Sequence, residues 1–596
     1  MADEVTAQDR SNSSKVSRRS LLAAAGAITG GAALAGIPRA ARAAGRTFDA
    51  EADVIVVGGG GAAFAAAVAA AQGGARVLVL EKAPAIGGTT ARSGGAYWIP
   101  NNHLMQARGV NDPKPDAVKL MARLSYPTVY DPDSPQLGLD RFTYDSIAGY
   151  YDRGSQVVQQ LDQMGVIRSQ FAALLPGQNP TGGITWTHPD YHAELPENKA
   201  THGRTLNPVG SEGGGGGSLM TGLATFARRR GVRILTSQHV IQIATNGKGE
   251  VVGVLALTPQ GERMYRARRA VVFGSGGFTQ DRSKVMNYLR APIFGGCAVP
   301  TNTGDFIDMA SQIGARMGNM RNGFFVQHVL EQALANSSVV DDLWIPPGDS
   351  MIMVNRYGDR VSSEKTPYNE HTQSHFVWDT NRAEYPNLVQ FMVYDDALAN
   401  DPAQAYGQPI PRPGTQAPFV ISGATIPQLA ENVQRRLDEL RGRYSITNSI
   451  GPSVRLTDGF ADNLQRTIER FNEFARNGHD PDFGRGSTPI QVSWGGPRRR
   501  GNTKNSSMYP LSSSGPYHCI LIGGGTLDTN GGPLVDTSAR VIHIDGQPIP
   551  GLYGAGNCIA SPAGQAYWSA GGTIGPGLTY GFTAGESAVK EPVKEV

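Results

Sequence analysis

The chain has 596 residues, of which 40% are hydrophobic and 18% are charged, and its formal net charge is +3. This composition is typical of globular proteins, and the small net charge argues against nucleic acid as the main partner. The three cysteines, Cys297, Cys519 and Cys558, form neither a C-x-x-C pair nor a cluster with histidines. We therefore expect no metal site of the zinc or iron–sulfur type, while a disulfide stays open.

The first 43 residues have the layout of an export signal. The pair Arg18 and Arg19 precedes a moderately apolar run that ends at Ile37, and 41–43 offers small residues beside a cleavage point. This pattern is typical of a twin-arginine signal peptide. The run is short and weakly apolar for a membrane span, although an uncleaved anchor stays open. We expect a protein exported by the twin-arginine route, periplasmic or otherwise extracytoplasmic, with no integral membrane span in the mature chain.

The most informative segment follows. An apolar strand at 54–57 runs into a glycine turn at 58–61, an alanine-rich helix starts near Ala62, and a second apolar strand at 77–80 ends at Glu81. A strand, a tight glycine turn, a helix and a second strand that ends in an acid form the fingerprint of an ADP-ribose site. The alternative is a purely structural glycine turn.

Each part of this segment has a physical role in such a site. Gly58 permits the tight turn, and Gly60 lets the backbone approach a pyrophosphate, which the helix N-terminus attracts. Ala63 stands where the third glycine is usual, and it is an accepted variant because that residue only permits close packing of helix and strand. Glu81, about 20 residues past the glycines, can accept both ribose hydroxyls.

Further elements can be predicted from hydrophobic periodicity and turn residues. In chain order we expect helices over 117–124, 144–164 and 219–230, a strand over 232–235, a hairpin of 240–243 with 251–257, strands over 269–273 and 551–554, and a helix from 575 to 588. The sequence therefore favours the α/β class.

The predicted cofactor-binding signals lie at both ends of the chain, whereas the middle is richer in Pro, Asn and Arg. We therefore expect a Rossmann-like cofactor-binding domain, a parallel sheet with helices, that is interrupted by an α+β catalytic or cap domain. The predicted parts are a signal peptide at 1–43, the first part of the cofactor domain at 48–319, the inserted domain at 320–507 and the second part of the cofactor domain at 508–590. A pocket between the two domains is the expected place for an active site.

Together these segments resemble the flavoprotein superfamily of fumarate reductase and the 3-ketosteroid Δ1-dehydrogenases. Residues 87–95 resemble its second glycine loop, 274–278 and 304–305 resemble further flavin-domain turns, and 554–557 resembles the strand end near the isoalloxazine. The resemblance implies FAD, and the absence of histidine from 87–95 implies that it is held non-covalently. The implied cofactor-binding residues are Gly58, Gly60, Gly61, Ala62, Ala63, Glu81, Lys82, Gly88, Thr89, Thr90, Ser93, Gly94, Gly95, Val240, Gly276, Gly277, Asn557, Gly572, Thr573 and Ile574.

The resemblance is closest to the 3-ketosteroid Δ1-dehydrogenase branch. Residues 561–575 lack the arginine with which fumarate reductases bind a carboxylate, and they also lack the histidine of that motif. Instead Tyr567 and Gly571 match the dehydrogenase spacing. Two further segments supply the other tyrosines of that branch, Tyr191 in a D-Y-H-A-E-L-P stretch and Tyr368 after a G-D-R-V stretch.

This branch implies removal of two hydrogens from adjacent carbons beside a ketone, with hydride passing to the flavin and a proton to a tyrosine. Tyr368 is the implied base, assisted by Tyr191, whose hydrogen bond we expect to lower the pKa of the phenol. Tyr567 and Gly571 are the implied oxyanion hole. His192 can relay the proton, or it can be a surface or supporting histidine.

Several alternatives stay open. Trp568 either reshapes the substrate pocket or packs outward, and the export signal puts the steroid itself in question, so the expected partner is a small-molecule ketone, with a steroid as one possibility. An exported enoate or fumarate-type reductase is the first rival, with Arg204, Arg356 and Arg360 as candidate cations. An electron-transfer flavoprotein with an inert pocket is the second. The electron acceptor is unknown, and both a quinone and a cytochrome are open.

Overall fold

The computed structural model describes residues 41–42, 47–174, 178, 184–210, 215–339, 342–343, 345–405, 407–443, 445–446, 448–499 and 501–596. The predicted signal peptide, apart from residues 41 and 42, lies outside the described residues. Among the residues that the structure describes, no helix combines the length and the apolar composition that crossing a bilayer requires.

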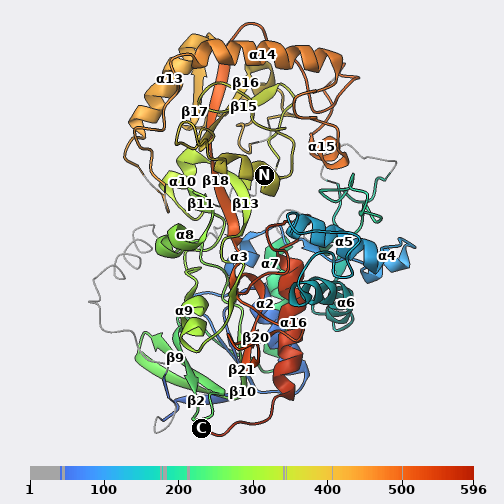
Figure 1. Cartoon of the computed structure of the whole chain (residues 1–596), viewed down its shortest axis with the longest axis vertical. Helices are drawn as coiled ribbons and strands as arrows, with labels where there is room; N and C mark the ends of the chain where they lie inside the picture. The colour runs from blue at the N-terminus through green and yellow to red at the C-terminus, as the bar shows by residue number, and fades with distance from the viewer. Residues whose placement is uncertain are drawn as a thin grey trace, which may run out of the picture. The chain divides into compact units, whose positions relative to one another are not determined.

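The first sheet is built on the strands predicted to form the cofactor domain. Strand β2 (Ala50–Val57) pairs in parallel with β3 (Val77–Leu80) on one side and with β10 (Gly261–Phe273) on the other, and β10 pairs in parallel with β21 (Pro548–Gly554). Segments from both ends of the chain thus lie side by side (Figure 1). The other strands of this sheet are β1 (Ala41–Arg42), β7 (Arg233–Leu235), β8 (His239–Thr245), β9 (Val251–Thr258) and β20 (Arg540–Ile542).

Two helices pack tightly against each other beside this sheet. Helix α2 (Gly61–Gln72) follows β2 directly, and α16 (Ile574–Lys590) lies against it, although the two are far apart in sequence (Figure 1). A Cβ at Gly581 would come 2.3 Å from the carbonyl oxygen of Ala62, and one at Gly585 would come 2.2 Å from that of Ala66. The glycines of α16 therefore permit this close approach. The predicted α/β class with a Rossmann-like sheet is confirmed.

A second sheet lies largely in the middle of the chain. Its central strand β18 (Tyr517–Thr529) pairs antiparallel with β13 (Gly323–Val329) and with β16 (Val389–Asp395), and helices α13 (Ile426–Glu439) and α14 (Phe460–Asn477) pack on the same apolar core. Because β18 begins after residue 507, this sheet extends beyond the segment predicted as an insertion, and the domain bounds stay a prediction. The other strands are β11 (Gly295–Gly296), β14 (Asp342–Leu343), β15 (Met351–Val354) and β17 (Val420–Gly423).

The remaining elements include most of the predicted helices, and the segment 87–95, expected as a loop, contains a short helix. These elements are α3 (Gly88–Arg92), α4 (His103–Ala107), α5 (Lys114–Ser125), α6 (Arg141–Gln163), α7 (Gly215–Arg229), α8 (Arg282–Tyr288), α9 (Asp305–Gln312), α10 (Leu330–Ala335), α11 (Tyr368–Gln373), α12 (Asp396–Ala399), α15 (Pro489–Trp494), the 3-10 helices η1 (Ser374–Phe376) and η2 (Gly556–Cys558), a small sheet of β4 (Tyr97–Trp98), β5 (Ser169–Phe171) and β6 (Thr205–Pro208), and the pair β12 (Met317–Gly318) and β19 (Gly532–Pro533).

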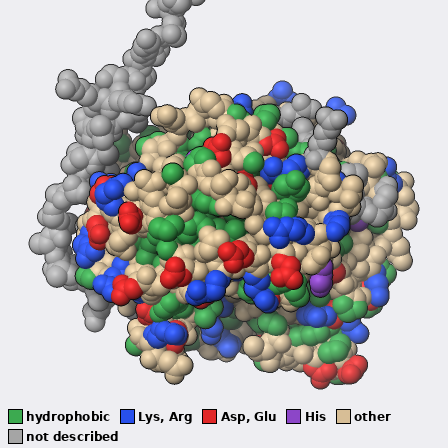
Figure 2. Space-filling model, turned by 90° about the horizontal axis from the view of Figure 1, so that it is seen from above, with side chains coloured by type: hydrophobic (Ala, Val, Ile, Leu, Met, Phe, Trp, Pro, Cys, Tyr) green, Lys and Arg blue, Asp and Glu red, His purple; other side chains and the backbone are tan. Residues whose placement is uncertain are grey.

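The three cysteines are all buried and free, so the disulfide that the sequence left open is not formed. On the face seen in Figure 2, cationic and anionic side chains are interspersed rather than gathered into a patch of one sign. This distribution agrees with the small net charge.

Candidate active site

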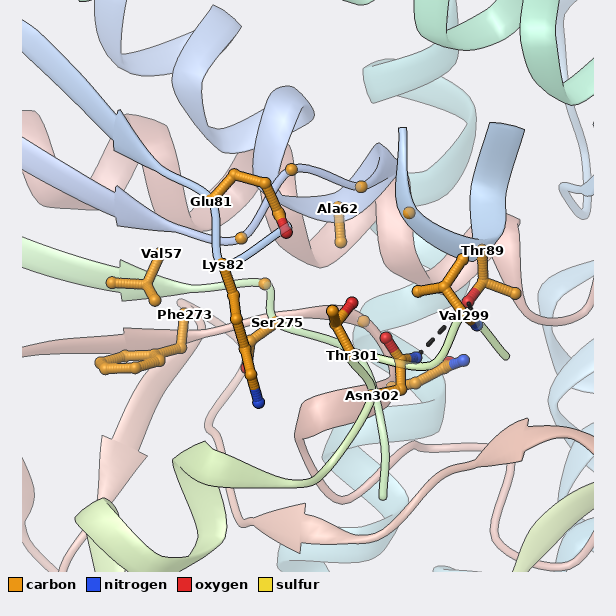
Figure 3. A pocket seen from close by; sticks show the side chains of 18 of the residues that line it. Val57, Ala62, Glu81, Lys82, Thr89, Phe273, Ser275, Val299, Thr301 and Asn302 are labelled. Carbon is orange, nitrogen blue, oxygen red and sulfur yellow. Dashed lines mark hydrogen bonds between the residues drawn. The ribbon is translucent and has the colours of Figure 1, made fainter. Parts of the chain in front are cut away.

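A groove lined by glycines lies where the first sheet meets α2, and we call it the glycine groove (Figure 3). Gly58 has φ +116°, in the region that favours glycine, and a Cβ there would lie 2.5 Å from the carbonyl oxygen of Gly274. Gly60 precedes α2 and has no side chain with which to cap it, while the Gly61 N–H donates to the Thr90 hydroxyl at 3.1 Å. The helix N-terminus therefore meets the groove with its positive dipole end, which suits a phosphate.

Glu81 and Lys82 line the groove at the end of β3 (Figure 3). The Glu81 carboxylate is buried and accepts the N–H of Ala83 at 2.6 Å, and burial raises its pKa. It lies beside the glycine turn, because a Cβ at Gly59 would lie 2.6 Å from its Oε2. Lys82 donates to Thr303 at 2.6 Å and to Asp305 at 2.9 Å. Glu81 is thus placed to accept hydroxyl groups, whereas Lys82 is held by protein partners.

Asp528, at the end of β18, organises the far wall of the groove, and the sequence analysis missed it. Its carboxylate accepts the backbone N–H of Gly277 at 2.9 Å and the side-chain amides of Asn302 at 2.8 Å and Asn557 at 3.2 Å. It is buried, and burial raises its pKa. Asp528 therefore ties the second sheet to the turn after β10. The sequence signal for this role is an aspartate near the end of a largely apolar, glycine-rich strand.

A larger cavity of about 430 Å³ adjoins the groove and contains the predicted tyrosines, so we call it the tyrosine cavity. Thr89, Thr90, Asn557, Thr573 and Ile574 line both spaces. One elongated ligand can therefore extend from the glycine turn to the tyrosines. The described residues fit the predicted FAD: the groove would hold its ADP half, and the cavity would receive its ring end.

Most of the predicted cofactor-binding residues line one of these two spaces. Those that line the groove are Gly58, Gly60, Gly61, Ala62, Glu81, Lys82, Gly88, Thr89, Thr90, Val240, Gly276, Asn557, Thr573 and Ile574, and Ser93, Gly94 and Gly95 line the cavity. Ala63, Gly277 and Gly572 line neither space. Ala63 packs against the turn after β10, as its role in helix–strand packing predicts, because a Cβ at Gly274 would lie 2.7 Å from its backbone nitrogen.

The structure brings the three predicted tyrosines together although they come from distant segments. The ring centroids of Tyr191 and Tyr368 are 5.5 Å apart, those of Tyr368 and Tyr567 are 5.1 Å apart, and those of Tyr191 and Tyr567 are 6.1 Å apart. All three rings are buried. Trp494, which the sequence analysis did not single out, stands edge-on to Tyr191 with 5.5 Å between ring centroids and lines the same cavity.

Burial is the largest cause of the pKa shifts of these three phenols. It raises the pKa of Tyr191 and Tyr368 well above the usual value of 10 and also raises that of Tyr567. The expectation that the neighbouring phenol lowers the pKa of Tyr368 is therefore wrong for this structure. Burial is the largest cause of the rise, and the interactions with Tyr191 and Tyr567 raise the pKa of Tyr368 further.

Tyr567 and Gly571 are direct neighbours at the cavity wall. The backbone N–H of Gly571 donates to the Tyr567 hydroxyl oxygen at 3.2 Å. Gly571 has φ +94°, and a Cβ there would lie 2.6 Å from the backbone of Tyr97, so no larger residue fits. Since the two donors are this close, both can reach one ligand oxygen once the bond between them opens.

Two open questions of the sequence analysis concern neighbours of these tyrosines. Trp568 is buried and packs away from the cavity: it stacks on Tyr150 with 5.4 Å between centroids and donates to Ser125 at 2.9 Å. The ring of His192 lies 3.6 Å from Glu370 and 3.8 Å from Glu194. Burial alone would lower the pKa of His192, but the two glutamates outweigh it and raise the pKa to about 10. His192 is therefore a cation at neutral pH.

The three arginines considered as ligands for a dicarboxylate are all engaged elsewhere. Arg204 is fully buried and holds Asp112 at 2.7 Å and Asp190 at 2.6 Å. Arg360 holds Glu364 at 2.8 Å and Asp480 at 2.9 Å, and Arg356 holds Glu384 at 2.7 Å. None of the three lines the groove or the cavity. They fix loops of the protein instead of facing a ligand.

We expect Arg204→Met to lower the free energy of unfolding by about 3–5 kcal/mol, because it leaves the buried carboxylates of Asp112 and Asp190 unpaired. Urea unfolding followed by tryptophan fluorescence measures the loss. Lys114→Met is the control, since the Lys114–Asp152 pair is exposed and contributes about 0–1 kcal/mol. Equal losses in the two variants would contradict a structural role for Arg204.

Comparison of the sequence with known proteins identifies a family and several relatives. Residues 53–574 match the family described as FAD binding domain. The 4-oxocyclohexanecarboxylate 2-dehydrogenase of Sinomonas cyclohexanicum is 30% identical over 546 residues, which cover 86% of this chain and 88% of that protein. The 3-oxosteroid 1-dehydrogenase of Mycolicibacterium smegmatis is 28% identical over 607 residues, which cover 90% and 96%.

Solved structures show the same fold. The 3-ketosteroid Δ1-dehydrogenase of Sterolibacterium denitrificans superposes with a TM-score of 0.73 at 24% identity, with 90% of this chain and 99% of that chain covered. A flavocytochrome c3 fumarate reductase superposes with a TM-score of 0.60 at 21% identity, with 91% and 79% covered. The fold is thus shared by dehydrogenases and reductases, and the side chains of the site have to discriminate between them.

Proposed function

Since this chain belongs to the FAD binding domain family and is an FAD-dependent oxidoreductase, we propose that it dehydrogenates a carbon–carbon bond beside the ketone of a ring. The observation that carries the proposal is the meeting of Tyr191, Tyr368 and Tyr567 in one buried cavity that continues into the glycine groove. The relatives named for 4-oxocyclohexanecarboxylate and 3-oxosteroids act on ring ketones, which supports the same class here.

The residues of the groove would hold the cofactor. Glu81 would accept the ribose hydroxyls, and the N-terminus of α2 would bind the pyrophosphate. Thr573 and Ile574 at the start of α16 line both the groove and the cavity. When bound, FAD supplies the acceptor for the hydride that leaves one of the two carbons.

The protein itself handles the proton and the developing charge. The phenolate form of Tyr368, with Tyr191 beside it, takes the proton from the carbon next to the ketone and becomes the neutral phenol. The Tyr567 hydroxyl and the Gly571 N–H hold the ketone oxygen and stabilise the negative charge that develops on it. Burial of all three phenols keeps water away from the reacting carbons and strengthens these interactions.

The two rival functions lack support from the site. A fumarate-type reductase needs cations for two carboxylates, and Arg204, Arg356 and Arg360 are paired with acids outside the cavity. An inert electron-transfer pocket predicts scattered tyrosines, but the three rings lie within 6.1 Å of one another.

Anaerobic titration tests the proposed direction. We expect a saturated ring ketone to bleach the flavin absorbance within the mixing time, and a substrate panel with an artificial electron acceptor to show turnover. Reoxidation of the dithionite-reduced protein by fumarate, without bleaching by any ketone, would instead establish the reductase.

We also propose that the flavin is held non-covalently, because the segment 87–95 offers no histidine for attachment. Acid precipitation of the purified protein is expected to release the flavin into the supernatant. A yellow pellet after repeated washing would contradict this expectation, and mass spectrometry of its peptides would then locate the attachment.

The twin-arginine motif at 18–19 leads us to propose export of the protein to an extracytoplasmic compartment. Mass spectrometry of the mature N-terminus tests the proposal. A mature chain that begins near residue 44 is expected, and an intact Met1 on protein recovered from the cell envelope would argue for an uncleaved anchor.

A further inference from the structure

The tyrosine cavity contains one charge that the proposed chemistry does not use. Of the described residues that line the cavity, Arg92 is the only one with a permanent charge, and the same lining contains no Asp, Glu or Lys. The other lining residues are apolar or neutral, and burial lowers the pKa of His188, which keeps that ring neutral. An arginine stays protonated at every pH at which a protein is folded. The cavity therefore has a fixed positive charge.

The guanidinium of Arg92 is held in place by uncharged groups. Its Nη1 donates to the Ser338 hydroxyl at 2.6 Å and its Nη2 to the Ser338 carbonyl oxygen at 3.1 Å. Ser338 is buried, and its hydroxyl donates to the carbonyl oxygen of Ala298 at 2.8 Å. Ala298 follows Cys297, which lines the cavity. Ser338 thus fixes the head of Arg92 beside the segment that carries the cavity-lining Cys297. Its charge is left uncompensated, since no ion pair among the described residues includes it.

This arrangement suits an anionic group of a ligand. Arginine has five N–H donors in a planar fork that matches a carboxylate, and Ser338 occupies only part of them. Low-dielectric walls such as Trp494, Ile345 and Leu527 strengthen the attraction between the cation and an anion inside. Since the described lining contains no second permanent cation, the cavity matches one carboxylate and not two.

We propose that Arg92 determines substrate specificity by binding a carboxylate on the ring ketone, so that the preferred substrates are cyclic keto acids and not neutral ketones. This inference rests on the proposed dehydrogenation. The ketone end of the substrate lies at Tyr567 and Gly571, the carboxylate lies at Arg92, and the apolar walls enclose the carbon ring between them.

The first experiment compares a keto acid with its neutral ester. We expect wild type to prefer 4-oxocyclohexane-1-carboxylate over its methyl ester. Arg92→Met is expected to lower kcat/KM for the acid by roughly 10- to 100-fold, mainly through KM, and to change that for the ester by less than about 3-fold. Arg92→Lys is expected to retain part of the preference, because it keeps the charge and loses the fork.

Arg168→Met is the matched control, because it removes one positive charge from an exposed arginine outside the cavity. It is expected to leave both substrates unchanged. The flavin content of each variant is measured as well. The inference is overturned if Arg92→Met loses kcat/KM equally for acid and ester, or if wild type shows no preference for the acid. It is also overturned if Arg92→Met protein is purified without flavin, because Arg92 would then serve the cofactor.

A second experiment does not depend on turnover. Cyclohexanecarboxylate has no ketone, so it can occupy the Arg92 end without being dehydrogenated. We expect it to perturb the flavin spectrum of wild type and to bind roughly 10- to 100-fold more weakly to Arg92→Met, whereas cyclohexanecarboxamide binds both weakly. If no ketone bleaches the flavin, the proposed function fails, while this titration still decides whether Arg92 binds a carboxylate.

Discussion

Replacing Tyr368 with phenylalanine is expected to lower kcat/KM for the ketone by about 10²–10⁴-fold, the usual contribution of a general base. The variant loses one hydroxyl in a cavity where Tyr191 and Tyr567 still pack around the ring. We therefore expect normal flavin content and normal folding. Steady-state rates with an artificial electron acceptor, set against flavin absorbance, measure the loss.

The pH dependence identifies the base more sharply. Burial raises the pKa of Tyr368 well above 10, so the phenol is protonated at neutral pH and its reactive phenolate becomes about ten times more abundant with each pH unit. We expect log kcat/KM of wild type to rise with pH toward the alkaline limit of folding, and Tyr368→Phe to lose this rise. The exposed Tyr509→Phe is the control and should retain it. A flat profile in wild type would argue against a tyrosine base.

Tyr567→Phe is expected to lower kcat by about 10²–10³-fold, which corresponds to about 2.7–4 kcal/mol for one lost oxyanion donor. The loss is incomplete because the N–H of Gly571, which lies 3.2 Å from the Tyr567 oxygen, still reaches the ketone. Since the base is untouched, this variant is expected to keep the rise of activity with pH. That separates the two roles, and loss of the rise in both variants would contradict the assignment.

The sequence predicted the parts of the site that are local in the chain. The strand, turn and helix around Gly58 follow from neighbouring residues, and the structure places them as expected. The three tyrosines came from resemblance to a family, because nothing in periodicity or spacing relates Tyr191 to Tyr567. Their meeting depends on loops that other contacts fix, such as the buried pairs of Arg204.

What the sequence could not supply are roles that arise between distant segments. Asp528 acts through partners that precede it by more than two hundred positions, at Gly277 and Asn302. Arg204, which resembles a free cation in the sequence, is neutralised by Asp112. Arg92 lies inside the second glycine loop, where the family resemblance concerns the glycines. A role for its charge can be inferred only from the structure, because the described lining of the cavity contains no acidic residue.

The pairing of β21 with β10 and of α16 with α2 bears on when the protein can load its cofactor. Everything between Phe273 and Pro548 has to leave the ribosome before the last parallel strand can dock, and α16 follows later still. Contacts of such long sequence separation form late, since the closure of a large loop precedes any gain from them. The part of the groove and cavity wall formed by Thr573 and Ile574 is thus missing until the chain is almost complete. We therefore expect the protein to bind its flavin at the end of synthesis or after it.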